Sequence, residues 1–158
     1  MRRTAITLVT LFLAPALLGL VSAATPDDII LNGDMSDWPE DSLQSTDSNG
    51  VTFRMTWNAT HLFLGWSGSD WSSMSDGADL FVYLNTSEGG SPLSKEWSLS
   101  QTLPFAADHA FVLEDSSYSA LQTHDGTGWV DSTSSATSWI GWSGNQNTEI
   151  AIPWSGID

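Results

Sequence analysis

The chain has 158 residues, no cysteine and a formal net charge of −15. A length of this order suits one domain with its own hydrophobic core. No disulfide can form, and the acidic surface repels nucleic acid and anionic membranes, so nucleic acid is excluded as a partner.

Residues 1–23 have the pattern of a secretory signal peptide. Arg2 and Arg3 open the chain, an apolar run covers residues 5–21, and small residues precede the expected cleavage point before Ala24. We expect an apolar helix here, separate from the domain, and a secreted or cell-surface protein. An uncleaved membrane anchor is the alternative, although the run is near the lower length limit for a span. Residues 24–158 keep two basic and 19 acidic residues, a formal charge of −17.

Short alternating segments separated by Gly, Asn, Asp and Ser clusters fill the rest of the chain. Pro104 is expected to end any strand within residues 95–105. The pattern predicts a single all-β domain, a two-sheet antiparallel β-sandwich of the immunoglobulin-like or jelly-roll-like kind. The expected strands are residues 29–31, 51–57, 61–67, 79–85, 110–114, 119–123, 129–130, 138–142 and 149–152.

The apolar faces of these strands predict the core. Alternation along residues 51–57 places every second side chain on one half-buried face. Residues 79–85 are apolar on both faces, which is typical of a central strand. The residues expected to be mostly buried are Ile30, Trp38, Val51, Phe53, Met55, Trp57, Leu62, Leu64, Leu80, Val82, Leu84, Val112, Ile150 and Ile152.

The most informative segment is residues 30–38, where a short apolar strand runs into a turn. Asn32 and Gly33 form a strong turn dipeptide, because both tolerate positive φ. Trp38 follows closely and can fold back as a plug. A late segment, residues 148–157, places Glu149 in an apolar strand that ends in Pro and Trp.

In order and spacing, these two segments and the strands at 62–66 and 79–85 resemble family 9 carbohydrate-binding modules and the related DOMON-like β-sandwiches. The resemblance covers roughly the whole chain after the signal. It implies a non-catalytic sugar-binding domain with structural calcium near such loops. In that family further strands follow the late segment. We therefore expect residues 24–158 to be truncated at the C-terminus and to belong to a larger exported protein, such as a glycosidase with this accessory module.

Nine tryptophans are a large excess for this length. Trp71, Trp97 and Trp129 lie in turn-rich surroundings, where a flat ring can stack on the apolar face of a sugar while polar neighbours bond its hydroxyls. These three are the predicted ligand-binding residues. The alternative is that they pack in the core, as expected for the tryptophans within strand patterns.

Asp34 and Asp37 are the predicted metal ligands. Ca²⁺ is a hard ion that takes carboxylate and backbone oxygens, and both can come from this turn. The competing interpretation is that the two carboxylates cap turns through side-chain-to-backbone hydrogen bonds.

The sequence contains no recognisable catalytic motif, so we do not expect an enzyme. No Gly-x-Ser-x-Gly elbow occurs, and the histidines lack zinc-site spacing. One chemical alternative is a haem-binding electron-transfer domain, since some DOMON-like domains bind haem through Met and His, or Met and Lys. Met55, Met74, His61 and His109 are available for this. The other alternative is a structural surface or adhesion domain.

Overall fold

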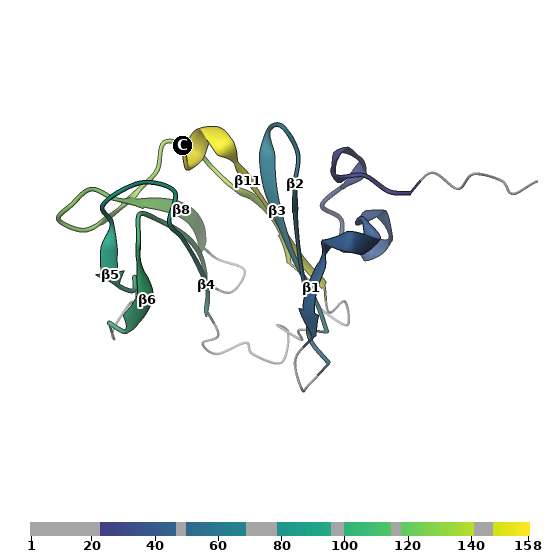
Figure 1. Ribbon diagram of the computed structural model, residues 1–158, viewed down its shortest axis with the longest axis horizontal. Helices are drawn as coiled ribbons and strands as arrows, with labels where there is room; N and C mark the ends of the chain where they lie inside the picture. Colours follow the sequence, from purple (N-terminus) through teal and green to yellow (C-terminus); the bar gives the residue numbers. More distant parts are fainter. Residues whose placement is uncertain (1–22, 47–49, 69–78, 96–99, 115–117, 141–146) are drawn as a thin grey trace, which may run out of the picture.

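Two antiparallel sheets pack face to face as a β-sandwich, which confirms the predicted fold class (Figure 1). This computed structural model describes residues 23–46, 50–68, 79–95, 100–114, 118–140 and 147–158. The signal-peptide prediction falls on residues outside these ranges, apart from Ala23. No helix in the described part of the chain has the length and apolar character that crossing a membrane requires.

The first sheet, sheet A, has the strand order β1-β2-β3-β11-β10, and all its neighbours are antiparallel. Strand β11 lies beside β3 although most of the chain separates them. Pairing brings Ile150 opposite Leu64 and Ile152 opposite Leu62. Its strands are β1 (Leu43–Thr46), β2 (Thr52–Trp57), β3 (His61–Ser67), β10 (Thr137–Ile140) and β11 (Asn147–Pro153).

The second sheet, sheet B, has the order β4-β7-β8-β9, again with antiparallel neighbours. Here consecutive strands pair through short connections, except that β5 and β6 intervene between β4 and β7. Its strands are β4 (Asp79–Leu84), β7 (His109–Glu114), β8 (Tyr118–His124) and β9 (Trp129–Asp131).

Strands β5 (Ser91–Leu93) and β6 (Thr102–Ala107) form a separate hairpin on the side of sheet B away from sheet A (Figure 1). The expectation that Pro104 ends a strand is wrong, because Pro104 lies within β6. Among the described strands, β6 pairs only with β5, and the register shifts between its two paired positions. A proline is tolerated in such an edge strand, because its missing N–H interrupts no central ladder.

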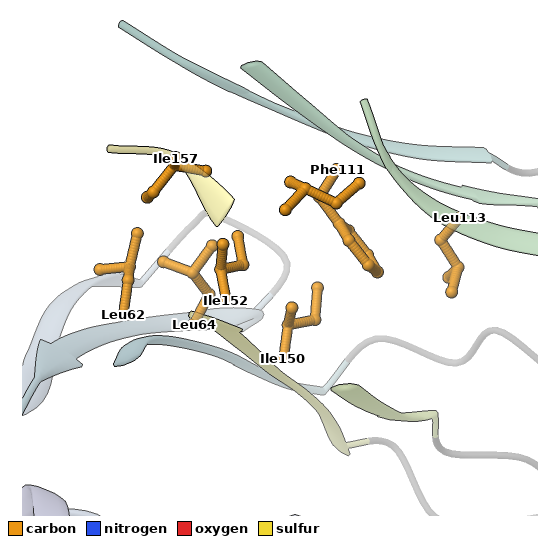
Figure 2. Packing of buried hydrophobic residues seen from close by; sticks show 8 residues of the cluster. Leu62, Leu64, Phe111, Leu113, Ile150, Ile152 and Ile157 are labelled. Atoms are coloured by element: carbon orange, nitrogen blue, oxygen red, sulfur yellow. The ribbon is translucent and has the colours of Figure 1, made fainter. Parts of the chain in front are cut away.

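The main core lies between the two sheets. Figure 2 shows Leu62, Leu64, Ile150 and Ile152 of sheet A pointing toward Phe111 and Leu113 of sheet B. Ile157 closes one end of this cluster, just after the short 3-10 helix η5 (Trp154–Gly156). Burial of these branched and aromatic side chains supplies the main stabilisation, at about 25 cal/mol for each Å² of apolar surface removed from water.

A second, smaller cluster lies on the outer face of sheet A. Trp38, Phe63 and Ala151 are buried there, and Ile29, Leu31 and Met35 pack against them. The covering segment is the N-terminal one, which holds the 3-10 helices η1 (Pro26–Asp28), η2 (Met35–Asp37) and η3 (Glu40–Ser42). The expected first strand at residues 29–31 is therefore wrong, because this segment lies across the sheet without pairing in it.

Most of the predicted core is buried or partly buried, with two exceptions. Ile30 is 64% exposed, because only its neighbours Ile29 and Leu31 face the sheet. Trp57 is 61% exposed at the last position of β2, although Phe53 and Met55 on the same face pack against the core. Alternation along a strand gives the face of a residue, but it does not say where the opposite sheet ends.

Candidate functional site

Trp129 is the one predicted sugar-binding tryptophan within the described residues; Trp71 and Trp97 lie outside them. Trp129 opens β9 and is partly buried. The turn before it is held by the Asp125 carboxylate, which accepts hydrogen bonds from the Thr127 hydroxyl and from the amides of Thr127 and Gly128. These bonds, the Thr127 hydroxyl first, lower the pKa of Asp125 to about 2.

Strand alternation places Trp129 on the outer face of sheet B. In β4, β7 and β8 the side chains of Leu80, Phe111 and Leu121 enter the core, so the residues between them point outward. Register pairs Gln122 with Asp131 and His124 with Trp129. Besides Ala110 and Val112, which are fully buried, the outer face carries two groups of side chains, one aromatic and one polar.

The aromatic group consists of Phe81, Tyr83 and Trp129. The rings of Phe81 and Tyr83 are stacked, with centroids 6.2 Å apart and planes 5° from parallel. Trp129 meets Tyr83 edge-on at 6.0 Å, and His124 flanks Trp129 at 5.4 Å. The Tyr83 hydroxyl donates to the Lys95 carbonyl at 2.7 Å, which ties this group to the segment after β5. Such contacts hold the rings in one orientation.

The polar group consists of Tyr118, Gln122 and Asp131. The Gln122 amide donates to Asp131 Oδ1 at 2.8 Å and to the Tyr118 hydroxyl at 3.4 Å. Gln122 is only 4% exposed, and its Oε1 is buried without a hydrogen-bond partner among the described residues. A buried acceptor without a donor is costly, so this amide oxygen lowers the stability of the polar group.

Sequence reasoning missed the polar group and Tyr83, the partner of Trp129 on β4. The sequence predicted a strand at residues 119–123. It did not predict how this strand pairs with β9, because residues 129–130 are too few to set a register from sequence.

The N-terminal turn shows how Asp34 and Asp37 are bonded. Asp34 Oδ1 accepts from the Ser36 amide at 2.9 Å and caps η2. Asp37 Oδ2 accepts from the Ile30 amide at 2.8 Å, and its Oδ1 is buried without a partner among the described residues. Both carboxylates thus make the bonds expected of turn caps. Within the described ranges, no three His, Asp or Glu side chains are grouped as a metal site; calcium at this turn stays a prediction.

The side chain of Glu149, on β11, bonds to several residues of this turn. Glu149 lies on the outer face of sheet A and is nevertheless fully buried. Its carboxylate accepts from the Trp38 indole N–H at 2.8 Å, from the Asn32 amide at 2.9 Å and from the Gly33 amide. Burial raises the pKa of Glu149 and the nearby Asp37 charge adds to this, although the three hydrogen bonds oppose the shift. The prediction that Trp38 folds back and is buried is confirmed, because Trp38 is only 4% exposed.

The residues considered for haem lie on both sheets. Met55 on β2 packs against the main core, and His61 starts β3. His109 is buried at the start of β7, with its Nε2 4.0 Å from Asp108 Oδ2. Met74 lies outside the described residues, and haem binding stays an untested alternative.

Comparisons of the chain with protein-family models, with curated proteins and with solved structures gave no match. The resemblance to carbohydrate-binding modules therefore stays a prediction.

Proposed function

We propose that this protein is a non-catalytic, exported carbohydrate-binding module whose ligand lies on the outer face of sheet B at Trp129. The observation that carries the proposal is the position of Trp129 beside Asp131 on one strand face, with Tyr83 behind its ring and Gln122 bonded to Asp131. A sugar needs this pairing of a flat apolar surface with polar groups next to it.

Three features support a sugar over other ligands. The ring of Trp129 is partly exposed and already oriented, so little conformational entropy is lost on binding. Asp131 is exposed and can accept a hydrogen bond from a sugar hydroxyl. The basic start and apolar run of the leader also favour export, where glycans are accessible.

The expected affinity is weak. A single stacked ring with a few solvent-exposed hydrogen bonds gives dissociation constants on the order of micromolar to millimolar. The acidic surface, with a formal net charge of −15, should further disfavour sulfated or uronic glycans.

The test is a glycan array of neutral and acidic oligosaccharides, followed by titration calorimetry on the best ligand. Trp129→Ala should abolish measurable binding. Trp57→Ala is the matched control, because Trp57 is an exposed tryptophan on the other sheet. Binding that is equally strong in both variants, or no binding to any glycan, would reject the proposal and favour a structural surface domain.

A further inference from the structure

A cleft of about 190 Å³ lies at the free edge of sheet B, where Leu121 of the main core forms part of its lining. It is bounded by β8, by the end of β9 and by residues 132–136. Its lining consists mainly of serine hydroxyls, from Ser119, Ser132, Ser134 and Ser135. The carboxylate of Asp131 and the apolar side chain of Leu121 also line it.

The inner wall of this cleft is held in place by the backbone. The Ser132 amide donates to the Leu121 carbonyl at 2.8 Å, and the Ser132 hydroxyl accepts from the Ser134 amide at 3.1 Å. Behind the wall, a Cβ at Gly156 would come within 2.8 Å of Leu121 Cδ2 and 2.9 Å of Ser134 Cβ. The last turn of the chain therefore packs closely against the wall, and the cleft is preformed.

Two of the lining serines face solvent. Ser119 and Ser135 are exposed, and both line the cleft. A serine hydroxyl both donates and accepts, so these two can bond a ligand that offers alternating donors and acceptors. The carboxylate of Asp131 accepts only, which opposes an anionic ligand.

Asp131 links this cleft to Trp129. The two residues are two positions apart on β9, so their side chains share one face and are separated by about 7 Å along the strand. Asp131 lines the cleft and also accepts the hydrogen bond from Gln122. A ligand stacked on Trp129 and extended along β9 would thus enter the cleft at Asp131.

We propose that the cleft is a second sugar subsite, which takes one uncharged ring of an oligosaccharide whose neighbouring ring stacks on Trp129. The cleft is smaller than the pockets of about 300–1,000 Å³ that enclose drug-sized ligands, and its volume suits a single ring. Its hydroxyl lining matches a neutral polyol, and Asp131 disfavours a uronate or sulfate at this position. The inference rests on the proposed function, and it adds that the module binds at least two linked neutral rings.

The experiment uses the whole chain and the best neutral oligosaccharide from the array, with the corresponding monosaccharide and an oligogalacturonate as further probes. Two variants address the cleft: the double substitution Ser119→Ala/Ser135→Ala removes exposed hydroxyls, and Ser135→Leu fills the space. Ser45→Ala and Ser45→Leu are matched controls, because Ser45 is an exposed strand serine on sheet A.

Both cleft variants should weaken oligosaccharide binding about tenfold, since each lost hydrogen bond changes affinity by a factor of about two to ten. Monosaccharide binding should stay within about twofold of the unaltered protein, and the oligogalacturonate should not bind. Cleft variants that bind the oligosaccharide like the Ser45 controls, while Trp129→Ala loses it, would overturn the subsite and leave the proposed function standing. Failure of every glycan to bind would overturn both.

Discussion

The indole N–H of Trp38 donates to Glu149 Oε1 at 2.8 Å, although 111 residues separate them in the chain. The same carboxylate receives the amides of Asn32 and Gly33. One buried side chain of β11 therefore holds the N-terminal turn against the outer face of sheet A. Asn147 adds to this by donating its side-chain amide to the Gly33 carbonyl at 2.7 Å.

Replacing Trp38 with Phe should lower the free energy of unfolding by about 1–3 kcal/mol, because it leaves Glu149 Oε1 buried without its donor. Urea denaturation followed by circular dichroism measures the difference. Trp57→Phe is the control; its side chain is 61% exposed, so a change within about 0.5 kcal/mol is expected. Equal effects of the two substitutions would contradict the proposed importance of the Trp38–Glu149 bond.

Gly65 should not tolerate a larger residue, since Trp38 lies directly over it. A Cβ at this position would come within 3.0 Å of Trp38 Cη2 and Cζ2 and within 3.1 Å of Met35 Cε. We expect Gly65→Ala to cost about 1–3 kcal/mol of stability through displacement of the indole. Gly128→Ala provides the comparison, because nothing lies within 4 Å of its added Cβ. A neutral Gly65→Ala in thermal melts would show that Trp38 does not occupy this position.

Stability should depend on pH through Glu149. Burial raises the pKa of Glu149 in the folded protein, so the native state binds the proton more tightly than the unfolded chain does. The free energy of unfolding should therefore fall as pH rises from the ordinary glutamate pKa through the raised folded value. Glu149→Gln should be less stable overall, because an amide offers one accepting oxygen instead of two, and it should lack this slope. Parallel pH curves for the two proteins would refute the prediction.

Asp108 should produce the opposite pH dependence. Burial alone would raise its pKa, but hydrogen bonds from Ser87 and Thr86 outweigh burial and lower the pKa to about 2. The stability from this carboxylate is present above the ordinary value of 3.8 and is lost as pH falls toward about 2. It amounts to about 2 kcal/mol. Asp108→Asn should remove most of it at neutral pH, whereas Asp41→Asn, at an exposed site, should not.

Calcium at the N-terminal turn is tested by melting. If Asp34 and Asp37 hold an ion, a chelator should lower the melting temperature, and added Ca²⁺ should restore it in proportion to occupancy. The double substitution Asp34→Asn/Asp37→Asn should abolish the response to the chelator. An unchanged melting temperature in the unaltered protein would leave both carboxylates as turn caps only, consistent with their bonds to Ser36 and Ile30.

The sequence by itself was enough to predict the fold class and most of the core. Period-two alternation in residues 51–57 and the apolar segments within residues 61–67, 79–85 and 150–152 correspond to β2, β3, β4 and β11. These predictions succeed because burial of one strand face is a local property that the spacing of apolar residues records. The turn at Asn32 and Gly33 was predictable for the same reason, since turn chemistry is local.

Only the tertiary structure decided which distant residues meet. Trp38 bonds Glu149, Trp129 contacts Tyr83, and Gln122 bonds Asp131. Each of these contacts depends on strand order and register, which join segments far apart in the chain, and no local pattern specifies them. The exposure of Trp57 and the strand through Pro104 have the same origin, because both depend on where a neighbouring sheet or strand ends.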